Sequence, residues 1–191
     1  MMFRLVALAL ALAALPSFVV AQTSDSGAAD VLSPSTPASL QAMHGTIRRN
    51  LAEAAAAMPA EDYAFKPTPE MRSFGALVAH MAIGNAFFCA QAKGERPQLP
   101  ANLEQATDKA VLVKALNDSL SYCDDVYTTT TDANVNALVT LIGPAAKRTA
   151  RGSVLVFNTT HNNEHYGNVV VYLRLKGRVP PSTARVQPPR P

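Results

Sequence analysis

The sequence predicts an all-α protein built as a four-helix bundle, and its composition and its apolar spacing point to this fold. The chain has 191 residues, of which 48% are hydrophobic and 16% charged, as expected for one globular domain. Trp is absent and aromatic residues make up 6%, so the core must consist mainly of Ala, Leu, Val and Met. Apolar residues recur at spacings of three and four in four stretches that Gly and Pro separate, which is typical of amphipathic helices.

Residues 1–21 are expected to be a signal peptide. Arg4 precedes an unbroken apolar run from Leu5 to Leu15, and Ala21 ends a stretch suited to cleavage. A run of this length is shorter than the ~20 residues of a membrane-spanning helix, although an uncleaved anchor is the alternative. The protein is therefore expected to be exported, to the periplasm or outside the cell, with no stable membrane anchor. Residues 22–37 are expected to form a flexible leader.

The bundle is expected to span residues 38–179. Ser39 is expected to cap the first helix, which ends at Met58-Pro59, and Ser73 to cap the second, which ends at Gly94. The expected apolar sides of these two helices comprise Leu40, Met43, Ile47 and Leu51, and Phe74, Leu77, Val78, Met81 and Phe88.

The third helix is expected from about Thr107 to Tyr127, and the fourth from about Thr149 to Leu175, ending at Gly177. Residues 133–147 are ambiguous. The segment Val169–Leu173 has the composition of a strand, but the helical spacing around it favours helix. Residues 180–191 are expected to form a loose, Pro-rich and basic tail.

The two cysteines, Cys89 and Cys123, are expected to form a disulfide if the protein is exported; two buried thiols are the alternative. Each lies 16 positions after the expected start of its helix, so the two are level only if the second and third helices run parallel. Parallel helices need a long crossover, and residues 94–106 can provide it. The disulfide and the parallel pair therefore imply each other.

Three of the four histidines form a candidate metal site. His161 and His165 are four residues apart on the expected fourth helix, so both imidazoles point to the same side. His80 lies among apolar residues on the inward side of the second helix, and is the expected third ligand. His44 is expected to lie at the surface or rim. Three imidazoles leave coordination positions open, which is typical of catalytic sites; zinc is the first choice, with nickel, iron or manganese as alternatives.

Polar side chains accompany these histidines along the fourth helix. Asn158, Asn168 and Tyr172 are expected to support the ligands or to line a pocket, and Glu164 is a candidate general base. An ordinary exposed glutamate is the alternative for Glu164.

Other motif-based functions are disfavoured. Residues 161–165 match the H-x-x-E-H motif of one class of zinc peptidases, but those enzymes need an acidic ligand downstream and no Asp or Glu follows Glu164. Residues 147–191 are basic but lack interleaved stacking aromatics, so no nucleic-acid partner is expected.

The segments Met58–Pro69, Arg72–His80 and His161–Asn168 together resemble the DinB/YfiT-like superfamily, and the resemblance extends over most of residues 38–181. It implies a four-helix bundle with a long connection between helices two and three, and a divalent metal held by His80, His161 and His165. Many relatives have Gly-Gln where this chain has Gly167-Asn168.

The resemblance leaves two functions. Some relatives are transferases or isomerases that use low-molecular-weight thiols, and others are described as metal-dependent hydrolases. The chain is therefore expected to be a metal-dependent enzyme acting on a small-molecule substrate; the alternative is a metal-binding, structural bundle without turnover. A homodimer stays open.

Overall fold

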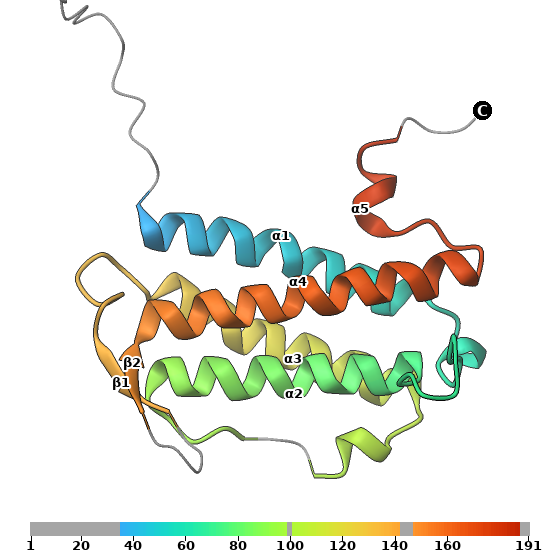
Figure 1. Cartoon of the computed structure of the whole chain (residues 1–191), viewed down its shortest axis with the longest axis horizontal. Helices are drawn as coiled ribbons and strands as arrows, with labels where there is room; N and C mark the ends of the chain where they lie inside the picture. The colour runs from blue at the N-terminus through green and yellow to red at the C-terminus, as the bar shows by residue number, and fades with distance from the viewer. Residues whose placement is uncertain (1–34, 99–100, 142–146, 188–191) are drawn as a thin grey trace, which may run out of the picture. The chain divides into compact units, whose positions relative to one another are not determined.

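The computed structural model describes residues 35–98, 101–141 and 147–187, and these are mostly helical, as expected (Figure 1). The expected signal peptide and residues 22–34 of the expected leader lie outside them. Four long helices account for most of the described residues, with two 3₁₀ turns, a short hairpin and a last short helix. The elements are α1 (Thr36–Ala57), a turn (Ala60–Asp62), α2 (Phe74–Lys93), a turn (Leu103–Gln105), α3 (Lys109–Thr128), β1 (Leu138–Thr140), β2 (Arg148–Ala150), α4 (Arg151–Leu175) and α5 (Pro181–Ala184).

Side-chain caps set where the helices begin. Ser73 Oγ accepts a hydrogen bond from the backbone N–H of Ala76 at the start of α2, as expected. Asp108 caps α3 in the same way, through Val111. The expected start of α1 at Ser39 was wrong: Ser35 is the cap, and the helix begins at Thr36. Gly94 ends α2 with a φ of 77°, a left-handed conformation that favours glycine.

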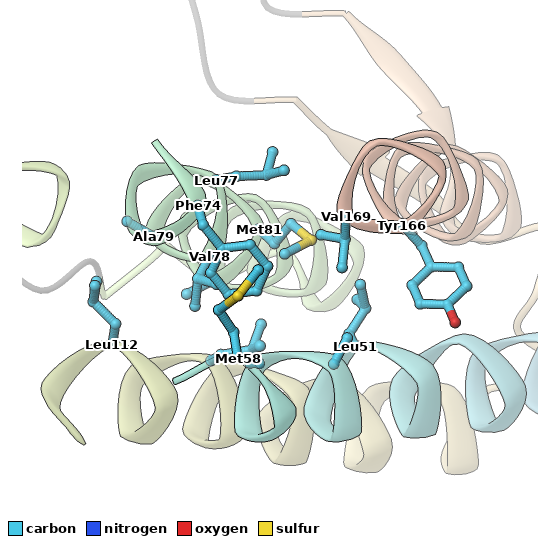
Figure 2. Close-up of a cluster of buried hydrophobic side chains, with 14 of the residues drawn as sticks. Leu51, Met58, Phe74, Leu77, Val78, Ala79, Met81, Leu112, Tyr166 and Val169 are labelled. Carbon is cyan, nitrogen blue, oxygen red and sulfur yellow. The ribbon is translucent and has the colours of Figure 1, made fainter. Parts of the chain in front are cut away.

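The four long helices pack side by side (Figure 1), with α2 against α3 and α4, and α1 against the same two. Their buried side chains form the core. The residues that meet there include Met58, which directly follows α1, Val169 of α4, and Phe74, Val78 and Met81 of α2 (Figure 2). The side chains of Met58, Phe74 and Val78 are fully buried, so this end of the helices is densely packed.

The contacts between α2 and α3 include two at different positions along the helices. Near the start of both helices, Gly75 lies against the side chain of Leu112. Further along both, Cys89 and Cys123 form a disulfide with a Cα–Cα distance of 5.4 Å, so the expected bridge is present. Helix α2 is long and apolar enough to cross a membrane, but 72% of the apolar window is buried within the protein, as in a core helix.

The ambiguous segment 133–147 contributes a strand. β1 pairs antiparallel with β2, with Val139 opposite Thr149. Because Arg148 and Thr149 lie in β2, helix α4 begins at Arg151 and not at Thr149. The rest of the expected fourth helix, including Val169–Leu173, is helical.

The expectation of a loose tail from residue 180 was wrong for residues 181–187. α5 packs against α1, and the hydroxyl of Tyr166 donates to Ser182 Oγ (2.9 Å). Arg185 also forms an ion pair with Glu53 and a hydrogen bond with Asn50. The sequence pattern misses these contacts because they depend on tertiary packing, and those of Arg185 join residues more than 100 positions apart.

Candidate metal centre

The structure brings His80, His161 and His165 together. His80 comes from α2 and the other two from adjacent turns of α4, which packs directly against α2. The Nε2 atoms form a nearly equilateral triangle: 3.1 Å from His80 to His165, 3.2 Å from His161 to His80, and 3.1 Å from His165 to His161. Three ligand atoms of the type that divalent metals prefer therefore converge on one point.

Hydrogen bonding alone cannot satisfy this triangle. A neutral imidazole nitrogen either carries a proton and donates, or carries a lone pair and accepts. Donors and acceptors cannot alternate around a ring of three atoms, so at least one of the three contacts joins two donors or two acceptors. A cation at the centre of three lone pairs removes this conflict.

The spacing also fits a metal ion. With Zn–N bonds of about 2.05 Å, nitrogens at these separations would subtend about 100° at the ion. That angle lies between about 90° for an octahedral face and about 109° for a tetrahedron. The three nitrogens therefore fit as one face of a coordination shell, with further positions left for water or a ligand.

Burial keeps the three imidazoles neutral. It is the largest cause that lowers the pKa of each, and it takes that of His161 to about 4, with smaller contributions from His165, His80 and Arg72. For His80 and His165 the positive charge of Arg72 acts in the same direction, while Glu164 raises the pKa. At neutral pH the ring nitrogens are therefore available as metal ligands.

Packing, more than hydrogen bonding, orients the rings. A Cβ on Gly84, one turn after His80 in α2, would lie 2.6 Å from Cε1 of His161, so only glycine leaves room for this ring. The ring of Phe88 lies on another side of His161, with ring centroids 5.5 Å apart. Within the described parts of the chain, the buried Nδ1 atoms of His161 and His165 have no hydrogen-bond partner. A metal-bound imidazole often donates its other ring N–H to a carboxylate or carbonyl, and among the described residues these two Nδ1 atoms have no such acceptor.

A cleft of about 500 Å³ opens beside His165. Asn168 and Tyr172, which the sequence predicted to be near the site, line this cleft. The hydroxyl of Tyr172 donates to the backbone carbonyl of Arg72 (2.7 Å), which joins α4 to the segment before α2. Sequence reasoning missed the other lining residues, because they come from the loop before α2 and from its first turn: Glu70, Met71, Arg72 and Leu77.

Asn158 lies elsewhere, which corrects the expectation for this residue. It is fully buried, and its Nδ2 lies 3.2 Å from Asn85 Oδ1 and 3.3 Å from the hydroxyl of Tyr127. The same atom is 3.6 Å from the sulfur of Cys89 and 3.8 Å from that of Cys123. Asn158 therefore belongs to a buried polar cluster beside the disulfide. Asn85 could not be predicted to join this cluster, because a lone Asn in an apolar helix has no distinctive spacing.

Glu164 is exposed and does not line the cleft. Among the described residues it makes no hydrogen bond with the three histidines, and it influences His80 and His165 through its charge. Its assignment as a general base stays a prediction.

His44 is not at the surface or rim. It is 3% exposed, its ring stacks on Tyr127 with centroids 4.0 Å apart, and its Nε2 lies 2.9 Å from Asp124. Arg48 binds the other oxygen of Asp124 at 2.7 Å. The reason lies in the spacing: His44 falls between Leu40 and Ile47 on the buried side of α1. Its role is to pack α1 against α3.

Comparisons with known proteins bear on the fold of the chain. A family model described as the DinB superfamily matches residues 44–169. No curated protein matches the chain.

Several solved structures share the fold. A DinB-like protein from Bacillus subtilis is 20% identical with a TM-score of 0.58, and the match covers 74% of this chain and 93% of that one. A DinB-like protein from Bacillus cereus is 12% identical with a TM-score of 0.61 and the same coverage. A mycothiol-dependent maleylpyruvate isomerase is 9% identical with a TM-score of 0.56, covering 70% of this chain and 60% of that one.

Proposed function

The chain belongs to the DinB superfamily, and we propose that it is an exported, metal-dependent enzyme acting on a small molecule. In this proposal His80, His161 and His165 hold one divalent ion, zinc as the first choice and nickel, iron or manganese as alternatives. The observation that carries the proposal is the triangle of Nε2 atoms 3.1–3.2 Å apart, which lies beside a cleft. An ion held by these three nitrogens would keep further coordination positions for water or a substrate.

The proposal extends to the arrangement of the helices: a four-helix bundle in which α2 and α3 run parallel. Its support is the order of the two contacts along both helices, since Gly75 and Leu112 meet near the starts and Cys89 and Cys123 meet further along. Residues 94–108 would then form the long crossover.

The chemistry follows from the donor set. An ion held by three neutral imidazoles lowers the pKa of a coordinated water or thiol, and polarises a bound carbonyl or phosphoryl oxygen. The chain's own residues would supply the rest. Asn168 would orient the substrate in the cleft, and Tyr172 would hold the loop before α2 in place. Glu164 would move a proton near the histidines.

The reaction class proposed is hydrolysis or group transfer. The similar isomerase depends on mycothiol, which is a precedent for thiol chemistry on this fold. Export argues for hydrolysis, because most thiol-dependent chemistry of this kind takes place in the cytosol. The disulfide between Cys89 and Cys123 supports export, because such bridges persist in oxidising compartments.

The alternative is a metal-binding bundle without turnover. One observation favours it: in the described ranges no carboxylate makes a hydrogen bond with any of the three histidines, so a general base in contact with the site is not evident.

Metal analysis of protein purified without chelator tests the metal site. We expect one divalent ion per chain, and its loss in His161→Ala. The matched control is His44→Gln, which removes a buried histidine outside the triangle and should keep the metal. Stoichiometric metal in His161→Ala would overturn the assignment.

A second measurement separates the enzyme from the structural alternative. In cobalt-substituted protein, added azide or a small thiol should change the visible spectrum if a coordination position faces the cleft. An unchanged spectrum would favour the non-catalytic bundle.

A further inference from the structure

The cleft beside His165 contains two polar side chains that the protein leaves without a partner. Arg72 lies directly before the cap of α2, and Asn168 lies one turn after His165 on α4. In the part of the chain that the structure describes, neither the guanidinium of Arg72 nor the amide of Asn168 makes a hydrogen bond or ion pair. Both are therefore free to bind a ligand.

The acidic residue that lines the same cleft does not neutralise Arg72. Glu70 is exposed, and its carboxylate is stabilised by hydrogen bonds with Thr68 and with its own backbone, which lower its pKa. The charge of Arg72 instead reaches the three histidines, where it disfavours protonation of each. Among the described residues, the guanidinium of Arg72 therefore has no carboxylate paired with it at the cleft.

The backbone at Arg72, whose side chain is exposed, is held by a residue of α4. Tyr172 donates its hydroxyl hydrogen to the Arg72 carbonyl, and Tyr172 itself is 1% exposed. His165, Asn168 and Tyr172 follow one another along one side of α4, at spacings of three and four residues. With a rise of 1.5 Å per residue, Asn168 and Tyr172 lie about 5 and 10 Å further along the helix than His165.

We propose that Arg72 and Asn168 form an anion-binding subsite, and that the ligand is a small molecule with a carboxylate or phosphate at one end. Its other end, about 5–10 Å away, would reach the histidine triangle. Guanidinium groups bind both anions through paired N–H donors, and the amide N–H of Asn168 adds a third donor. That the ligand is a substrate rests on the proposed function, but the subsite itself needs no metal.

Titrations of the metal-free protein followed by NMR test the subsite directly. Succinate represents carboxylates and inorganic phosphate represents phosphates. At least one of them should shift the resonances of residues around the cleft, and Arg72→Gln should weaken that binding by roughly tenfold. The anion whose binding is weakened more by Arg72→Gln identifies whether the ligand carries a carboxylate or a phosphate.

Two further variants complete the test. Arg72→Lys should bind with intermediate affinity, because it keeps the charge but loses the paired donors. Arg49→Gln removes an exposed arginine of α1, away from the cleft, and should bind as the unmodified chain does. Equal affinity of Arg72→Gln and the unmodified chain for both anions would overturn the subsite.

The metal content of the same proteins distinguishes this inference from the proposed function. Arg72→Gln should retain one metal per chain, since no ligand has been changed. A chain that binds no metal but shows anion binding dependent on Arg72 would refute the proposed function and leave the subsite standing. A chain that holds metal but shows no anion binding dependent on Arg72 would refute the subsite and leave the proposed function standing.

Discussion

Replacing Gly84 by alanine should damage the metal site without removing a ligand. The new Cβ would lie 2.6 Å from Cε1 and 3.2 Å from Nδ1 of His161. Carbon atoms pack at about 3.5–4.0 Å, so the imidazole would have to retreat by about 1 Å. That is about half of a Zn–N bond of ~2.05 Å, which is enough to take Nε2 of His161 out of the triangle. We expect metal affinity to fall on the order of 100-fold.

The fold itself should tolerate this change. Alanine in place of glycine stabilises a helix by roughly 0.5–1 kcal/mol, while overpacking costs about 1–3 kcal/mol. The free energy of unfolding of the metal-free variant should therefore fall by no more than about 2.5 kcal/mol. Its far-UV circular dichroism should be unchanged.

Competition with a chromophoric zinc chelator measures the affinity, and urea denaturation of metal-free protein measures the stability. Gly45→Ala and Gly167→Ala are matched controls, because a Cβ at either position meets nothing within 4 Å. Gly167 also lies in the same helix as two ligands. Both controls should bind zinc as the unmodified chain does. If Gly84→Ala also binds zinc with unchanged affinity, the argument that packing positions His161 is refuted.

Three further predictions concern the bundle. The pKa of His44 is lowered, mainly by burial, so below pH 6.5 the unfolded chain binds more protons than the folded one. The free energy of unfolding, measured in urea, should therefore fall as the pH drops from 7 to 5, and it should fall less in His44→Gln. An equal fall in both proteins would contradict this prediction. Replacing both Cys89 and Cys123 by alanine should lower the unfolding free energy by roughly 3–4 kcal/mol in the chain-entropy model, and unchanged urea midpoints would contradict it. Tyr172→Phe should cost about 1 kcal/mol of stability through the lost hydrogen bond to Arg72, again measured in urea, and no change would mean that water replaces the hydroxyl.

The helices and the three candidate metal ligands could be predicted because their signals are local. His161 and His165 share one side of a helix by their spacing, and Ser73 and Gly94 mark the ends of α2 through cap chemistry. The third ligand, His80, could be chosen because it lies on the apolar side of α2, which packs against α4. The same reasoning could have placed His44 in the core, since it falls between Leu40 and Ile47.

The cleft and the polar interior could not be predicted because they depend on tertiary packing. Arg72 lines the cleft beside His165 only because the loop before α2 lies beside Tyr172, a residue 100 positions away. Asn158 and Asn168 lie on the same helix, yet one is buried beside a disulfide and the other lines the cleft. The pairing of β1 with β2 could not be predicted either, because each strand has only three residues and no strong alternation of apolar and polar side chains.

The central claim is that three imidazoles share one metal ion. X-ray absorption at the metal edge of the metal-loaded protein measures how many imidazoles bind the ion. We predict a spectrum fitted by three histidine nitrogens at about 2.0–2.1 Å, with the remaining positions filled by oxygen. The histidine count should fall to two in His80→Ala. A metal bound by fewer than three imidazoles in the unmodified chain, or a spectrum unaffected by the loss of His80, would contradict the account.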